Sequence, residues 1–174
     1  MQTPYLHKKS GGHASSHVAT APGVRTLGDL LRARARRSPS RPAMYARPSG
    51  QGDWQLTTYG DFLERSSRVA RALLSTGVSV GDRVAILGPT QPAWPIYDFG
   101  AQLAGLVSWG IYPQQTVEQI HYLLEHSDTR VVFVDGESEL RSVLAAAATL
   151  PHLVAIVPWT EALYEQTRHQ DARL

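Results

Sequence analysis

The stretch GVSVGDRVAILGPTQPAW, residues 77–94, decides how this chain can fold. Its centre, Arg83 to Leu87, is a short and mostly apolar run, typical of a strand covered on both faces of a sheet. Gly77 is suited to end a preceding helix, because glycine readily adopts the left-handed conformation of a C-terminal cap. After the strand, residues 88–90 turn the chain toward a second helix. A buried strand followed by a helix is the building unit of an α/β protein.

The same alternation continues toward the C-terminus. Short apolar runs of this kind occur at 83–87, 106–111, 131–134 and 153–157. Apolar residues at helical spacing lie between them, most clearly after Thr116, where Gln119 completes a capping box. Strands and helices in this order imply right-handed crossovers and a parallel sheet. We therefore expect an α/β fold, a partial three-layer parallel sheet flanked by helices.

Upstream of residue 77, the sequence predicts a short helix, a hairpin-like element and a long helix. The two helices are marked by capping boxes, Thr26 with Asp29 and Thr58 with Asp61. Two short β-prone runs, at 43–46 and 54–57, flank a turn-rich segment between the helices.

The composition is that of a globular protein. The chain has 174 residues, of which 43% are hydrophobic and 18% charged. Residues 1–24 are rich in Gly, Ser, His, Ala and Pro without periodicity, so we expect a disordered tail there and the ordered part of the chain over 25–174. No window approaches the roughly 18 apolar residues of a membrane-spanning helix, and no signal peptide is recognisable. We expect a cytoplasmic protein whose only contact with a membrane is peripheral.

The turn at residues 88–90 raises the question of a phosphate site. Such a site requires consecutive backbone N–H groups at a helix N-terminus, usually with a lysine close behind. Pro89 removes one donor, and the only lysines are Lys8 and Lys9. A nucleotide cradle stays an alternative, but we favour a strand-to-helix turn capped by Thr90. We interpret a second Ser/Gly-rich run, residues 10–16, as flexible chain.

Cysteine is absent, which excludes disulfides, thiolate zinc sites and a cysteine nucleophile. The other groups to weigh as metal sites are His7, His13 and His17; His121 and His126; and Asp135, Glu137 and Glu139. The first group lies in the expected tail, and the second pair is about 140° apart on a helix. The acidic group lacks the glycine and terminal glutamate of a calcium loop, so we interpret it as a polar loop leading into the next helix. We expect no metal site.

Arginine is concentrated in the first helix and its exit, at positions 32, 34, 36, 37 and 41. A lipid or nucleic-acid surface is one interpretation of this run. We favour a solvated helix face, because these positions spread around the helix. The formal net charge of +2 does not argue for nucleic acid, and we expect no nucleic-acid partner.

Several blocks of the chain together resemble the beginning of an AMP-forming acyl-CoA synthetase. They are Trp54 to Asp61, Val69 to Leu73, Gly77 to Ile86, and, resembling the long-chain fatty acid branch, Gln91 to Trp94, Ala104-Gly105, Gly110 to Pro113 and Ile120 to Ser127. The resemblance implies the N-terminal part of an adenylate-forming enzyme's large domain, so that residues 25–174 would form an incomplete AMP-binding domain. In that family a fatty carboxylate attacks ATP, with Mg²⁺, to give an acyl-adenylate and pyrophosphate, and CoA then displaces AMP.

The family's catalytic parts do not fall within the matched region. Its Ser/Thr/Gly loop with a lysine, its ribose-binding acid and its catalytic lysine all lie beyond it, so we assign no catalytic residue. The turn from Gly110 to Thr116 resembles a loop near the CoA nucleotide in relatives of acetyl-CoA synthetase, which makes Tyr112, Gln114 and Thr116 candidates for contact with CoA. The alternative, which we favour, is a strand-to-helix turn capped by Thr116.

Our leading interpretation is a truncated N-terminal portion of an ATP-dependent long-chain fatty acid–CoA ligase, inactive alone and without a cofactor of its own. Its expected partners are the remainder of a synthetase or further copies of itself. The alternative is a non-catalytic interaction module that retains the fold, pairs with a complete synthetase or binds acidic surfaces.

Overall fold

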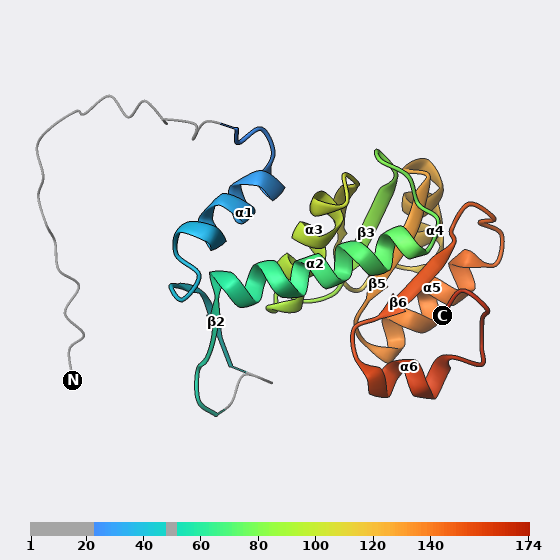
Figure 1. The fold of residues 1–174 in the computed structure, drawn as a ribbon. Coiled ribbons are helices and arrows are strands. Elements are labelled where there is room, and N and C mark those ends of the chain that lie inside the picture. The colour runs from blue at the N-terminus through green and yellow to red at the C-terminus, as the bar shows by residue number, and fades with distance from the viewer. Residues whose placement is uncertain (1–22, 48–51) are drawn as a thin grey trace, which may run out of the picture.

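A four-stranded parallel sheet forms the centre of the molecule (Figure 1). The computed structural model describes residues 23–47 and 52–174. The strands are β3 (Arg83–Leu87), β4 (Val107–Ile111), β5 (Thr129–Val134) and β6 (Ala155–Pro158). They are hydrogen-bonded in the order β4-β3-β5-β6, and every pairing is parallel. The predicted parallel sheet is confirmed, with strand ends moved by one or two residues. The expected tail lies outside the described residues as far as residue 22.

Helices cover both faces of this sheet. They are α3 (Ala93–Leu103), α4 (Val117–His126), α5 (Glu137–Ala147) and α6 (Glu161–Thr167). Along β3, Val84 and Ile86 join the core beneath α3 and an earlier helix, α2 (Tyr59–Ser75), whereas Ala85 and Leu87 join the core beneath α4 and α5. This alternation explains why the strands are apolar at consecutive positions. The three-layer arrangement is therefore as predicted; α6 was not anticipated.

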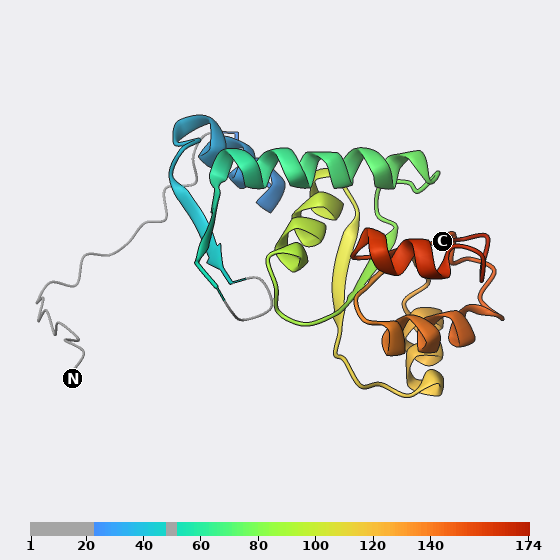
Figure 2. The ribbon, with the colours of Figure 1, turned by 90° about the horizontal axis from the view of Figure 1, so that it is seen from below.

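The N-terminal part of the chain lies to one side of the sheet except for its last helix, α2, which runs across one face of the sheet (Figures 1 and 2). It contains α1 (Leu27–Arg37), β1 (Pro42–Ala46), β2 (Gln55–Thr58) and α2 (Tyr59–Ser75). Strands β1 and β2 form an antiparallel ribbon separate from the main sheet. Both predicted capping boxes are present at α1 and α2. Helix α2 packs closely on α3, because a Cβ on Gly100 would lie only 2.4 Å from Val69 Cγ1.

The order of the strands places β4 and β5 on opposite sides of β3, so the connections that follow β3 and β5 run in opposite directions along the sheet. The chain leaves β3 for its neighbour β4, then returns past β3 to form β5 on the other side. In open parallel sheets, ligands bind outside the carboxyl ends of the strands near such a point. The carboxyl edge of β3, β4 and β5 is therefore the first place to look for a site.

Candidate functional site at the carboxyl edge of the sheet

A cavity of about 560 Å³ opens where the loops after β3 and β4 face each other. Its lining residues are Gly88, Pro89, Thr90, Trp94, Gly110, Ile111, Tyr112 and Pro113. All eight are uncharged at neutral pH. A triphosphate requires cations and convergent donors around its oxygens, so this lining does not fit one.

The turn after β3 has a packing explanation. Gly88 is buried, and a Cβ there would lie 2.6 Å from Cζ2 of Trp159. The glycine is thus needed to make room for the indole ring. The prediction that Thr90 caps the next helix is wrong: the N-cap is Pro92, which makes no side-chain cap hydrogen bond. An extra turn, closed by the Trp94 N–H donating to the Gln91 carbonyl at 3.0 Å, separates Thr90 from the helix.

The loop after β4 carries the three residues considered for CoA. Tyr112 lines the cavity and is 84% exposed, whereas Gln114 and Thr116 are not among the lining residues. Gln114 has a φ of 68°, a left-handed conformation that is uncommon for a side chain other than glycine. The Thr116 hydroxyl accepts from the Gln119 N–H at 3.3 Å, and the Gln119 amide oxygen accepts from the Thr116 N–H at 2.9 Å. This capping box confirms the predicted turn, and the contact with CoA stays a prediction.

An aromatic cluster lies at the carboxyl ends of β3 and β5, where the Trp159 ring packs beside Gly88. The Tyr97 ring stacks on Phe133 at a centroid distance of 4.2 Å and lies 5.4 Å from Trp159. Burial raises the pKa of the Tyr97 phenol, and the negative charge of Asp135 raises it further. Within the described ranges, the buried Trp159 Nε1 has no hydrogen-bond partner. No local sequence pattern predicts this cluster, because Tyr97 and Trp159 are 62 positions apart.

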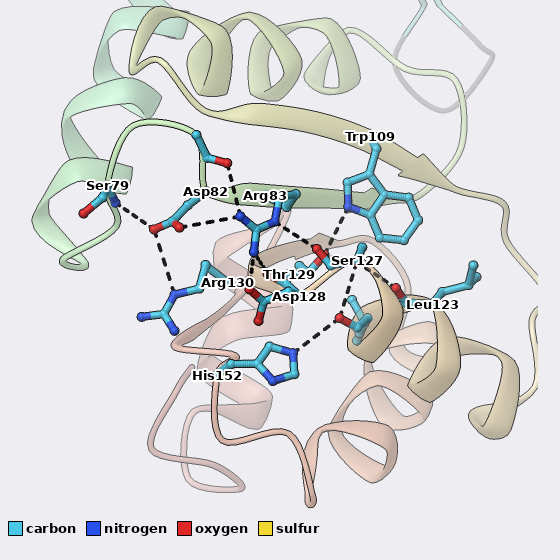
Figure 3. Close-up of polar contacts among 12 residues, drawn as sticks. Ser79, Asp82, Arg83, Trp109, Leu123, Ser127, Asp128, Thr129, Arg130 and His152 are labelled. Carbon is cyan, nitrogen blue, oxygen red and sulfur yellow. Dashed lines mark hydrogen bonds and ion pairs between the residues drawn. The ribbon is translucent and has the colours of Figure 1, made fainter.

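A polar network lies at the opposite, amino edge of the sheet (Figure 3). Arg83 donates to the carbonyl oxygens of Ser127 and Asp128 at 2.9 and 2.8 Å, and it also pairs with the Asp128 carboxylate. Asp128 has a left-handed φ of 51°. Arg83 therefore holds the turn between α4 and β5 against the start of β3. This network has a structural role and contacts none of the residues that line the cavity.

The other candidate groups remain separate in space. The Nε2 atom of His121 lies 2.9 Å from the Thr149 hydroxyl, whereas the His126 ring stacks on Tyr122. Glu137 lies in the first turn of α5 rather than in a loop, which corrects the interpretation of the acidic group. Within residues 23–47 and 52–174, no group of three His, Asp or Glu residues could hold a metal ion.

The tail histidines and the Ser/Gly-rich run lie outside the described residues. No helix in the described ranges is long and apolar enough to cross a membrane.

Comparison with protein families identifies the fold's origin. The profile of the AMP-binding enzyme family matches residues 31–173. The chain belongs to this family. The long-chain-fatty-acid–CoA ligase heimdall of Drosophila melanogaster is 31% identical over 145 residues, which cover 82% of this chain and 21% of the ligase. The long-chain-fatty-acid–CoA ligase ACSBG2 of Xenopus laevis is 31% identical over 119 residues, which cover 68% of this chain and 16% of the ligase.

Solved structures of AMP-binding enzymes agree with this assignment. The Mycobacterium tuberculosis fatty acyl CoA synthetase matches with a TM-score of 0.69 and 26% identity, over 82% of this chain and 28% of that one. The N-terminal domain of FACL13 from the same organism matches with a TM-score of 0.69 and 27% identity, over 86% of this chain and 37% of that one. This member of the AMP-binding enzyme family thus has the fold of an N-terminal portion, and it spans about a fifth of the length of the curated relatives it matches.

Proposed function

We propose that this chain is the N-terminal region of an ATP-dependent long-chain fatty acid–CoA ligase and that by itself it does not form an acyl-adenylate. The observation that carries the proposal is the family match over residues 31–173 combined with a carboxyl-edge cavity that has no charged lining residue. In the whole ligase, this region would support the site that takes fatty acid, ATP with Mg²⁺, and CoA.

The expected inactivity has an electrostatic reason. Attack on the α-phosphate needs donors and cations that are already in place where charge develops, and loss of one such donor typically costs on the order of 10²-fold in rate. The described residues contain arginine but no lysine, and none of their arginines lines the cavity. A cation that is not held in position contributes little to such preorganisation.

Pyrophosphate exchange with palmitate, ATP and magnesium tests this proposal. The purified 174-residue chain should give no exchange above background, whereas a complete fatty acyl-CoA ligase assayed in parallel should be active. Exchange that followed this chain through purification, and was lost when Lys8 and Lys9 were replaced by glutamine, would refute the expected inactivity. Cytoplasmic localisation is part of the same proposal and is tested by cell fractionation.

Tyr112 is the best placed of the three CoA candidates, because its ring lines the cavity. Trp94 lines the same cavity, so its fluorescence should report nucleotide binding there. A fluorescence change on CoA titration that is lost in Tyr112→Ala, and kept in Gln114→Ala, would support a contact through Tyr112 alone. No change with the unaltered chain would contradict it.

A non-catalytic interaction module is the second candidate function. It is favoured by an apolar hollow of about 300 Å³ between α2 and the sheet. The hollow is lined by Arg68, Val69, Ala72, Leu73, Thr76, Tyr97, Phe133 and Val157. Sedimentation of the chain with a purified complete ligase should then show a stable complex, weakened by Val157→Lys. Independent sedimentation of the two proteins would contradict this candidate.

A further inference from the structure

A second cavity, of about 380 Å³, opens where α1 packs against α2 and α3. Figures 1 and 2 both show α1 beside the first half of α2. The residues that line this cavity are Leu30, Leu31, Arg34, Ala43, Tyr59, Phe62 and Phe99. We call it the α1 cavity. It shares no lining residue with the carboxyl-edge cavity or with the apolar hollow between α2 and the sheet.

Helical spacing explains which side chains of α1 reach this cavity. Leu31 lies on the buried face of the helix, whereas Leu30 and Arg34, one turn apart, lie beside that face. Leu30 is 51% exposed, so its side chain lies at the opening. Across from α1, the buried Phe62 ring packs edge-on against Phe99 at a centroid distance of 5.1 Å. The interior of the cavity is therefore apolar and aromatic.

Arg34 is the one charged residue in this lining. It is partly buried, and its guanidinium carbon lies 4.7 Å from the centre of the Tyr59 ring. Among the described residues, Arg34 forms no ion pair and its guanidinium donates no hydrogen bond. Cation–π attraction to Tyr59 holds the guanidinium without occupying its N–H donors as a carboxylate would. A partly buried cation is thus left without an acceptor at the wall of an apolar cavity, where burial of an unpaired charge is costly.

We propose that the α1 cavity binds a small aromatic monoanion, with the anionic group on Arg34 and the ring between Phe62 and Leu31. One cation in an otherwise uncharged lining matches one anionic group on an apolar body, whereas a polyphosphate would require further cations. Phe62 and Phe99 favour an aromatic body, because rings pack edge-to-face. The volume lies near the lower end for ligand sites, which limits the body to roughly one or two rings.

This site goes beyond the proposed function, because the substrates of that function would bind at the carboxyl edge and the two cavities share no residue. A ligand in the α1 cavity contacts α1, α2 and α3 at once, so its binding stabilises the position of α1. A sulfonate carries the required charge but cannot be activated as a carboxylate substrate is. A sulfonate probe therefore tests this site independently of catalysis.

Equilibrium dialysis of the 174-residue chain with 2-naphthalenesulfonate tests the proposal, and the neutral 2-naphthalenesulfonamide measures the contribution of the rings alone. The sulfonate should bind with a Kd on the order of 0.1–1 mM. It should bind at least about tenfold more tightly than the sulfonamide, because it accepts charge-assisted hydrogen bonds from Arg34. Arg34→Met should abolish this preference and change sulfonamide binding by less than about twofold, since methionine keeps an unbranched apolar side chain. Ala43→Leu should weaken binding of both probes at least about fivefold, because it fills part of the cavity.

Matched variants separate this cavity from other surfaces. Arg36→Met removes the same charge from an exposed position of α1 outside the lining, and Ala72→Leu adds the same volume to the apolar hollow between α2 and the sheet. Both variants should bind the sulfonate within about twofold of the unaltered chain. Circular dichroism checks that every variant is folded. Equal binding of the two probes, equal losses from Arg34→Met and Arg36→Met or from Ala43→Leu and Ala72→Leu, or no sulfonate binding at about 10 mM would overturn the proposal.

Discussion

The residue type at position 88, at the carboxyl edge of the sheet, is determined by contact with Trp159. A glycine after a buried strand suggests close approach of a ligand, but here the space beside it is taken by an indole ring. The buried Trp159 Nε1 lies in the same cluster as Tyr97, so the chain's own aromatic side chains occupy the space beside the carboxyl end of β3. The open volume lies instead between the loops after β3 and β4.

We predict that Gly88→Ala lowers the free energy of unfolding by about 1–3 kcal/mol, the usual cost of overpacking. The added Cβ would lie 2.6 Å from the Trp159 ring, so ring and backbone must move apart. Urea denaturation measures the change. In a Trp159→Leu background, the same substitution should cost clearly less, because the clash is removed. An equal cost in both backgrounds would show that the ring is not the reason for glycine.

Arg83 is the second residue whose role is set by distant contacts. We predict that Arg83→Met lowers the free energy of unfolding by about 1.5–3 kcal/mol, because the carbonyl oxygens of Ser127 and Asp128 lose a charged donor. Arg68→Met is the control, since Arg68 is exposed on α2 and pairs only with Glu64 among the described residues. Thermal unfolding compares the two variants. Similar shifts in melting temperature would contradict the structural role of Arg83.

At the scale of elements, helix starts differ in how they are stabilised. Helices α1, α2 and α4 begin with a complete capping box, α6 begins with the Thr160 hydroxyl as its cap, and α3 and α5 begin without a side-chain cap. Of the two uncapped helices, α3 is the one whose first turn lies beside the carboxyl-edge cavity. No side chain at its N-cap accepts from the first N–H groups of α3, so this helix start is less stabilised locally than the four capped ones.

Two threonines provide a matched test of this difference. Thr116→Ala should cost about 1 kcal/mol of stability, because the hydroxyl that accepts from the Gln119 N–H is lost. Thr90→Ala should change stability by less than about 0.5 kcal/mol, because Thr90 is exposed and caps no helix. Chemical denaturation of both variants checks the pair. A larger effect at Thr90 than at Thr116 would contradict the observed start of α3.

Acid should weaken the capping boxes. Hydrogen bonds from the Thr58 hydroxyl and backbone N–H hold the pKa of Asp61 below its ordinary value, and the pKa of Asp29 is lowered mainly by the Arg25 N–H and the Thr26 hydroxyl. A carboxylate with a depressed pKa in the folded state stabilises the fold above its unfolded pKa, and this contribution is lost as pH falls through the folded-state value, below about pH 4. The urea midpoint should therefore fall in this range, and fall less steeply in Asp61→Asn. An unchanged slope in that variant would exclude Asp61 as a contributor.

At the scale of the whole molecule, apolar surface remains uncovered between α2 and the sheet. The chain spans about a fifth of its curated relatives, and the hollow near Phe133 and Val157 is where a further segment or another molecule could pack. We predict that the purified chain self-associates at high concentration and binds a hydrophobic dye. Light scattering measures the mass, and Val157→Lys should reduce both effects. A monodisperse monomer without dye binding would contradict this prediction.

Local sequence patterns determined most of the elements and the fold class. Continuous apolar runs such as Arg83–Leu87 predict strands covered on both faces, and Thr58 with Asp61 predicts a helix start, because both signals act within a few residues. Gly77 follows Thr76, the C-cap residue of α2, and has the left-handed φ of 83° that its conformational freedom predicts. The family resemblance also rested on such local blocks, most of which specify turns and caps.

Only the tertiary structure decided what lies at the carboxyl edge. The position of β3 between β4 and β5 depends on packing between distant segments, and this order places the loops after β3 and β4 around one cavity. The turn from Gln91 to Trp94 moves the start of α3 away from Thr90, which capping preference alone cannot reveal. Trp159 meets Gly88 because the carboxyl ends of β6 and β3 lie close together in space. The cavity is uncharged because the residues that face it from the loops after β3 and β4 are all neutral.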